Sequence, residues 1–137
     1  MNTTNPLFAH LPGAESRTVG GVQLDVVPAG AARVKRMIYP PGFRWSKDMK
    51  PIVGTDYCQH AHVGFLACGE IHIEYTDGCV MELRAPHTVS IAPGHDGWVV
   101  GNEPVVLIEF DFGNQTVERM GCPPHTDTRR DLFSSAA

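Results

Sequence analysis

Hydrophobic and polar residues alternate along short stretches of this chain, and glycine or proline separates one stretch from the next. Residues 22–26, 70–75 and 79–84 each follow a period of two, which is typical of half-buried strands. Residues 76–78 (Thr-Asp-Gly) lie between two of these stretches and are typical of a hairpin turn, because glycine accepts a positive φ. About nine such stretches, and no helix of normal length, predict an all-β sandwich or barrel.

The two ends of the chain lack this alternation. Residues 1–20 contain scattered proline and glycine, and we expect them to form an N-terminal arm or edge segment. Beyond Gly113 the composition becomes polar, so residues 114–137 are predicted to be a C-terminal tail with one short helical turn near 130–133. The remaining residues, 21–113, are predicted to form one barrel domain, because 137 residues of which 42% are hydrophobic support a single core.

Composition and charge argue against several classes of partner. Fifteen acidic and eleven basic residues give a net charge of -4, without a basic cluster that would attract nucleic acid. No apolar run approaches the roughly 18 residues that a membrane helix requires. The N-terminus lacks the pattern of a secretion signal. We therefore expect a cytoplasmic protein with no nucleic-acid or membrane partner, whose four irregularly spaced cysteines are free thiols.

Four residues are candidate metal ligands. His60 and His62 are two apart, so their side chains point to the same face of an extended strand, and Cys58 has the same parity. Imidazole and thiolate are ligands for Zn, Fe and Ni. His95 follows a later turn, and we expect it to reach the same point inside the barrel. The alternative is that these are hydrogen-bonded structural residues or an ordinary solvated strand face.

Four aromatic residues are candidates for a ligand pocket: Tyr39, Trp45, Phe65 and Trp98. Small-molecule pockets are mostly apolar with a few convergent polar groups, so we expect these rings to surround a small ligand near the histidines. Core packing is the alternative for Trp45, because a large aromatic side chain often caps a hydrophobic core.

Three segments of the chain, residues 39–46, 54–69 and 93–104, resemble small single-domain bacterial cupins. They read Tyr-Pro-Pro-Gly-Phe-Arg-Trp-Ser, Gly-Thr-Asp-Tyr-Cys-Gln-His-Ala-His-Val-Gly-Phe-Leu-Ala-Cys-Gly and Pro-Gly-His-Asp-Gly-Trp-Val-Val-Gly-Asn-Glu-Pro. The resemblance spans residues 38–112 and implies a double-stranded β-helix barrel. It also implies a divalent metal ion, here Zn, Fe, Ni or Mn, which cupins often bind through three histidines and a carboxylate.

The cupin metal motif fits the first part of the chain in two registers. Aligning its histidine pair on His60 and His62 leaves no glutamate where the motif requires one. Aligning its last glycine on Gly69 places His62 at the glutamate position and Cys58 at a histidine position. We favour the second register, because the hairpin turn fixes Gly69. It makes Asp56, Cys58 and His62 the candidate ligands, with His60 optional.

The second cupin motif is only partly present, and the resemblance leaves two functions open. Gly94 occupies its expected place, but His95 stands two residues before the expected histidine. Residues two apart on a strand point to the same face, so the side chain of His95 is still expected to face the interior. As an enzyme, the protein would use a Lewis-acid metal on a small organic substrate, with no separate general base evident. As a metal-free binding or regulatory cupin, it would hold a small ligand without catalysis. We also expect a homodimer, because exposed sheet edges need cover.

Overall fold

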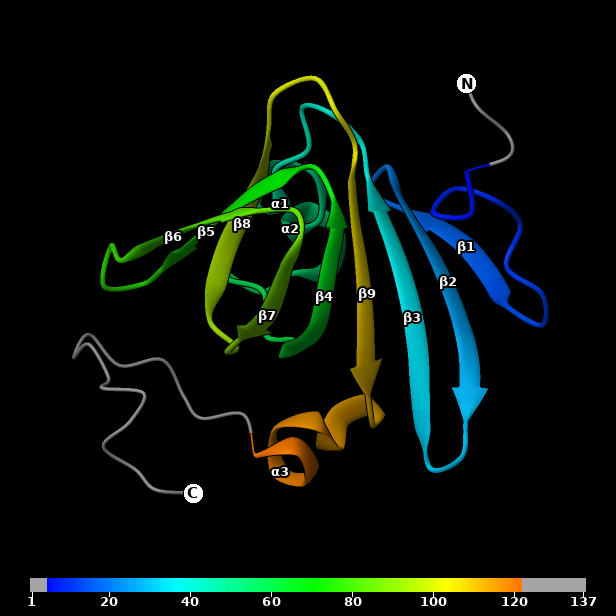
Figure 1. Ribbon diagram of the computed structural model, residues 1–137. Coiled ribbons are helices and arrows are strands. Elements are labelled where there is room, and N and C mark those ends of the chain that lie inside the picture. Colours follow the sequence, from blue (N-terminus) through cyan, green and yellow to red (C-terminus); the bar gives the residue numbers. More distant parts are fainter. Residues whose placement is uncertain (1–4, 122–137) are drawn as a thin grey trace.

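The strands form two antiparallel sheets in the computed structural model, which describes residues 5–121. The larger sheet has six strands in the order β1-β2-β3-β9-β4-β7, and the smaller has three in the order β6-β5-β8. Figure 1 shows the smaller sheet on one side of β9 and strands β1 to β3 on the other. This architecture confirms the all-β prediction. In chain order the strands are β1 (Glu15–Val19), β2 (Val22–Ala29), β3 (Ala32–Tyr39), β4 (His62–Cys68), β5 (Glu70–Tyr75), β6 (Val80–Arg84), β7 (His87–Ile91), β8 (His95–Val100) and β9 (Val105–Asp111).

The helical segments are short. Helices α1 (Trp45–Asp48) and α2 (Lys50–Val53) follow β3, whereas the 3-10 helix η1 (Gly113–Gln115) and helix α3 (Thr116–Met120) follow β9. Within residues 5–121, no helix has the length and hydropathy needed to cross a membrane. The segment predicted as a polar tail therefore begins with a helix. The helical turn expected near 130–133 lies outside the described residues.

Strand β1 lies within the segment that the sequence predicts as an arm or edge segment. It pairs with β2 along its whole length and forms one edge of the larger sheet. The chain before β1 is held by Arg36, whose guanidinium donates a hydrogen bond to the Ala9 carbonyl at 2.6 Å. Arg36 also pairs with the carboxylate of Asp25 at 2.9 Å, and both side chains are almost fully buried. The N-terminal segment is thus tied to the larger sheet.

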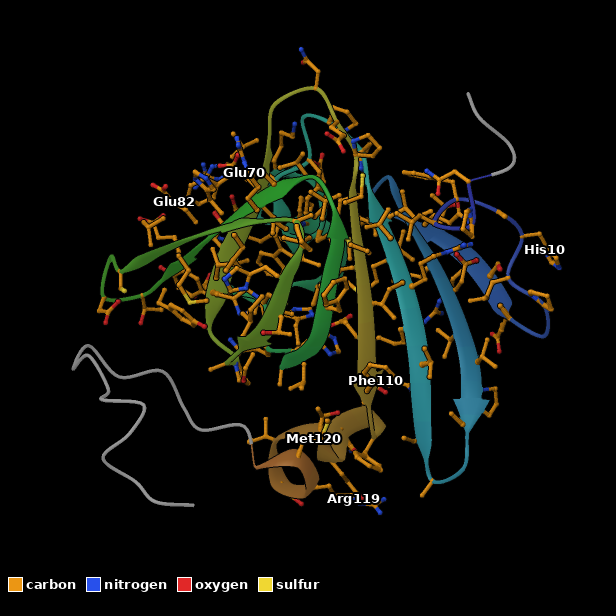
Figure 2. The ribbon with its side chains drawn as sticks, in the orientation of Figure 1. His10, Glu70, Glu82, Phe110, Arg119 and Met120 are labelled. Atoms are coloured by element: carbon orange, nitrogen blue, oxygen red, sulfur yellow. The ribbon has the colours of Figure 1, made fainter. Side chains whose placement is uncertain are left out.

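The smaller sheet follows the predicted alternation. Ile71 and Ile73 of β5 are buried, whereas Glu70 of β5 and Glu82 of β6 lie at its outer side, where Figure 2 labels them. The predicted turn at 76–78 joins β5 to β6, and the N–H of Gly78 donates to the Tyr75 carbonyl at 2.9 Å. The return strand begins at residue 80, one residue later than the alternation predicts.

The start of this hairpin requires glycine. Gly69 has φ +83, and a Cβ atom there would lie 2.5 Å from the carbonyl oxygen of Pro104. Any other residue would therefore combine a left-handed backbone with a steric clash. The turn that separates β4 from β5 is fixed at this position.

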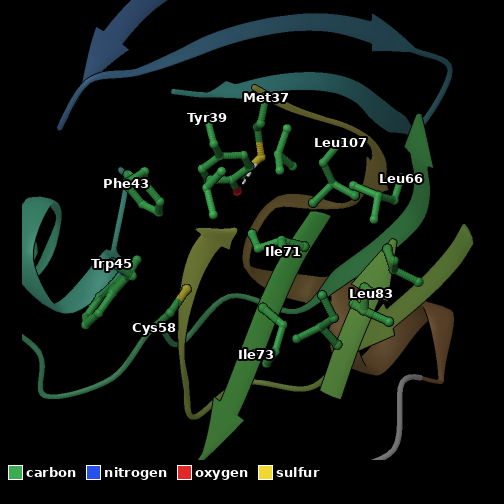
Figure 3. Close-up of a cluster of buried hydrophobic side chains, with 14 of the residues drawn as sticks. Met37, Tyr39, Phe43, Trp45, Cys58, Leu66, Ile71, Ile73, Leu83 and Leu107 are labelled. Carbon is green, nitrogen blue, oxygen red and sulfur yellow. Dashed lines mark hydrogen bonds between the residues drawn. The ribbon is translucent and has the colours of Figure 1, made fainter. Parts of the chain in front are cut away.

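The hydrophobic core lies between the inner faces of the two sheets, and Figure 3 shows part of it. Leu66 of β4 is fully buried, whereas its neighbour Phe65 is 41% exposed on the opposite face. The inner face of β4 is therefore the one that carries His62, Gly64 and Leu66. Because the same face continues to the start of the strand, His62 is buried at one end of the core.

Candidate metal centre

Two histidines converge from the first residues of two strands that belong to different sheets. His62 begins β4 in the larger sheet, and His95 begins β8 in the smaller one. Their residues are 8% and 3% exposed, and their ring centroids lie 5.1 Å apart. The structure therefore brings together the two imidazoles that are expected from the sequence to share one point.

Cys58 completes this group. Its backbone N–H donates to the His95 carbonyl at 2.8 Å, and its own carbonyl accepts from the N–H of Gly94 at 2.7 Å. This short bridge holds the loop before β4 against the start of β8. The sulfur lies 3.7 Å from Nε2 of His62, and Cys58 is 5% exposed. One ligand atom from each of Cys58, His62 and His95 lies within 4.8 Å of the other two.

The second nitrogen of each imidazole has an acceptor. Nδ1 of His95 lies 2.7 Å from the Ala92 carbonyl oxygen, and Nδ1 of His62 hydrogen-bonds Oε1 of Glu109. A carbonyl oxygen only accepts, so Nδ1 of His95 carries a proton and Nε2 is its remaining ligand atom. Histidines that bind metals usually donate their other N–H to a carbonyl or a carboxylate in this way. The three side chains therefore fit a metal ion.

The electrostatics of the cluster favour a deprotonated sulfur. Burial raises the pKa of the Cys58 thiol, but hydrogen bonds from His62 and His95 outweigh burial and lower this pKa from 9.0 to about 5. Burial lowers the pKa of His62, whereas the charge of Glu109 and the bond to Cys58 raise it to about 10. Without a metal, the pair is thus a thiolate beside an imidazolium. Metal binding would release the proton of His62.

A cavity of about 270 Å³ adjoins the cluster. Tyr39 and Trp45, two of the four aromatic residues proposed for the pocket, line it. Phe65 and Trp98 lie outside it. Phe65 is on the outer face of β4, and the Trp98 ring lies 4.4 Å from the Arg44 guanidinium on the outer side of β8. Phe65 and Trp98 do not line this cavity, because strand parity turns both side chains away from the interior.

The other two expected ligands, His60 and Asp56, do not join the cluster. His60 is exposed and lines the same cavity. It stays out of the cluster because β4 begins only at His62, so the strand parity that would align His60 with His62 does not apply. Asp56 has a side chain that is 87% exposed and lies 3.6 Å from the ammonium of Lys50. Of the residues in the favoured register, Cys58 and His62 are therefore the two that lie in the cluster.

Glu109 is a residue of the site that no motif in the sequence indicates. This residue lies on the inner face of β9, is 1% exposed and contacts His62 from 47 positions away in the chain. Within residues 5–121, its Oε2 atom is the one buried side-chain N or O atom without a hydrogen-bond partner. The available signal was an acidic residue inside the apolar stretch 105–110, since an isolated carboxylate is rarely buried without a role.

No protein-family model matches the sequence, and no curated protein sequence matches it. Solved structures share its fold. A cupin 2 conserved barrel domain protein from Salinispora arenicola matches with a TM-score of 0.54 and 15% identity over 83% of this chain and 94% of that chain. A cupin-like protein from Thermotoga maritima matches with a TM-score of 0.51 and 14% identity over 73% of this chain and 77% of that chain.

AerE from Microcystis aeruginosa also matches, with a TM-score of 0.54 and 17% identity. The match covers 72% of this chain but 45% of AerE, so the chain spans less than half of that protein. Identities this low establish a shared fold and leave the activity open. Together with the two facing antiparallel sheets, these likenesses show that the protein has the cupin fold.

Proposed function

We propose that the protein binds a divalent metal ion through Cys58, His62 and His95 and acts on a small organic molecule in the adjacent cavity. One observation carries the proposal. The Nδ1 atom of each imidazole already has an acceptor, which leaves both Nε2 atoms and the Cys58 sulfur for one ion. An ion bound there would supply Lewis acidity toward a carbonyl or enolate of the substrate.

The donor set bears on the identity of the metal. One thiolate and two imidazoles suit Zn, Fe or Ni better than Mn, which prefers oxygen ligands. Three protein ligands are also the number found in catalytic zinc sites, whereas structural sites usually have four. Zinc is therefore the first metal to test, and a site of this kind has room for water or a substrate atom.

The remaining residues of the site have positioning roles. Glu109 fixes the ring of His62 through Nδ1, and the Ala92 carbonyl does the same for His95. The walls of the cavity are mostly apolar, with Tyr39 and Trp45 among them, so they exclude water from a bound substrate. The protein thus holds its ligand atoms in place before any ion arrives.

Elemental analysis tests the proposal. Protein treated with excess zinc and then desalted should retain stoichiometric metal, and His62→Ala should lose it. His72→Ala is a matched control, because His72 also lies in a strand beside a glutamate but on the outer side of the smaller sheet. Metal-free wild-type protein after this treatment, or full retention by His62→Ala, would contradict the proposal.

A metal-free binding protein is the second candidate. The sulfur of Cys58 lies 3.7 Å from Nε2 of His62. As a thiolate and an imidazolium, the two side chains neutralise each other, so the pair is stable without a metal ion. The cavity beside it remains available to a small ligand. Binding of a ligand by protein that retains no metal would favour this function.

Two further expectations concern the setting of the protein. A homodimer is supported by Phe65 and Phe110, which are 41% and 46% exposed on the outer faces of the paired strands β4 and β9. Exposed apolar side chains on one sheet face are common at subunit interfaces. Light scattering on the purified protein measures its mass directly. A location in the cytoplasm stays a prediction.

A further inference from the structure

The cavity beside the candidate metal centre has basic residues in its wall. Of the described residues that line it, three are arginine or lysine (Arg17, Arg33 and Lys35) and none is aspartate or glutamate. The whole chain has the opposite balance, with 15 acidic and 11 basic residues. Because the basic residues gather here against the overall composition, the lining favours an anionic ligand.

Lys35 is the most enclosed of the three cations. Its side chain is 15% exposed, and its ammonium lies 3.0 Å from a carboxylate oxygen of Asp111. Arg33 pairs with the same carboxylate at 2.8 Å, so one negative charge is shared between two positive ones. Arg17 has no ion pair with any residue in the described range. An enclosed ammonium such as that of Lys35 is unfavourable when its charge is only partly neutralised, and a bound anion would complete the neutralisation.

Glu109 does not remove this excess. It faces inward opposite Lys35 in the β3–β9 register, but Oε1 is bonded to His62 and the residue does not line the cavity. If Glu109 and Asp111 are both counted against the three cations, one positive charge still remains. A divalent ion with a single thiolate ligand would add to it.

The sheet register places the basic residues near the candidate metal centre. Lys35 pairs with Glu109 across β3 and β9, and Glu109 pairs with Gly64 across β9 and β4. His62 stands two residues before Gly64 on β4 and hydrogen-bonds Glu109. Neighbouring strands are separated by about 4.8 Å, so the backbones of Lys35 and Gly64 are roughly 10 Å apart. A small molecule can span that distance.

We propose that the ligand of this cavity is an amphipathic organic anion, with a carboxylate held by Lys35, Arg33 and Arg17 and an apolar body directed along the cavity wall. The inference deepens the proposed function, on which it rests for the chemistry done to the ligand, but anion binding itself requires no metal. The apolar part of the wall comes from both sheets and the segment after β3: Leu24, Met37, Tyr39, Phe43, Trp45 and Ile71.

A pair of probes that differ only in charge tests the inference. Binding of 4-phenylbutanoate and of 4-phenylbutanamide is measured by calorimetry, with zinc-treated and with chelator-treated protein. We expect the carboxylate to bind at least about 10-fold more tightly than the amide, since charge-assisted hydrogen bonds are stronger than neutral ones. Equal affinities, tighter binding of the amide, or no binding of the carboxylate at millimolar concentration would overturn the inference.

Variants assign the preference to the basic lining. Lys35→Met should bring the two affinities within about 3-fold of each other, because it removes the most enclosed cation. Lys47→Met is the matched control: Lys47 donates to the Gly42 carbonyl, its side chain is 63% exposed, and it does not line the cavity. Arg17→Met removes a cation with no ion pair and serves as a second variant if Lys35→Met does not fold. An unchanged preference in both cavity variants would overturn the inference.

Metal content measured on the same samples separates this inference from the proposed function. If the wild-type protein retains no zinc but still prefers the carboxylate, the proposed metal function fails and the anion site stands. If zinc is retained and the carboxylate has no advantage over the amide, the metal function stands and the anion site fails.

Discussion

Two histidine–glutamate pairs of this protein differ mainly in the face of the sheet on which they lie. His62 bonds Glu109 between the sheets, where both side chains are less than 10% exposed. His72 bonds Glu70 at 2.7 Å on the outer side of the smaller sheet, with side chains 17% and 20% exposed. Only the inner histidine lies beside a thiol and a second imidazole. The outer one lies beside the Trp98 ring.

The comparison shows that residue types alone do not make a site. Burial strengthens the electrostatic coupling of the inner pair, so the charge of Glu109 helps to raise the pKa of His62 despite its burial. The outer pair is partly open to water, which screens it, and Arg84 binds the other oxygen of the Glu70 carboxylate at 2.9 Å. Metal binding is therefore expected at the His62–Glu109 pair between the sheets and not at the His72–Glu70 pair.

The largest expected difference is in metal affinity. Glu109→Gln keeps the shape of the side chain but removes the charge that orients His62, and should weaken zinc binding by about 10- to 100-fold. Competition with a chromophoric chelator measures the affinity. Glu70→Gln makes the same change beside His72 and should leave zinc binding unaltered. Equal zinc affinities of Glu109→Gln and Glu70→Gln would show that the inner pair has no special role in metal binding.

Adjacent residues of β4 extend the comparison to stability. Leu66→Ala removes a fully buried side chain and should lower the free energy of unfolding by about 2–5 kcal/mol. Phe65→Ala removes a larger side chain from the outer face and should cost less than about 1 kcal/mol. Urea denaturation of both variants measures the two values. A larger loss of unfolding free energy for Phe65→Ala than for Leu66→Ala would contradict the assignment of Leu66 to the core face of β4.

Two cysteines in different surroundings should differ in reactivity: Cys58 is buried in the cluster, and Cys68 bonds Glu103. The pKa of Cys58 is about 5, whereas burial and the Glu103 carboxylate raise the pKa of Cys68 to about 11. Only the thiolate is nucleophilic. In metal-free protein at pH 7, iodoacetamide should therefore alkylate Cys58 at least about 10-fold faster than Cys68. Peptide mass spectrometry follows both rates, and added zinc should protect Cys58. Faster alkylation of Cys68 would contradict the assigned thiolate.

The smallest expected effect is in acid stability. Burial raises the pKa of Asp111, but hydrogen bonds from Arg33 and Lys35 outweigh burial and lower this pKa from 3.8 to about 2. The carboxylate thus contributes stability above about pH 4, and this contribution is lost as the pH falls toward 2. Asp111→Asn should flatten the fall in thermal midpoint between pH 4 and 2. Glu70→Gln, which alters an outer ion pair, should change this slope less.

Local patterns in the sequence were sufficient for most of the strands, though not for β1, and for one half of the site. Alternation at 70–75 and the glycine of the 76–78 turn determine β5 and its hairpin, because side-chain parity and positive φ are properties of neighbouring residues. Parity predicts Cys58, His60 and His62 on one face; the structure brings Cys58 and His62 together and leaves His60 exposed. These are short-range constraints, and they do not depend on the rest of the molecule.

Long-range pairing decided the other half. Residues 63–67 are apolar on both faces, so only packing against β9 determined that Leu66 points inward and Phe65 outward. The bridge between Cys58 and His95, and the approach of Glu109 to His62, join segments tens of residues apart. Which strands become neighbours is set by burial of the whole core, and no single stretch of sequence contains that information.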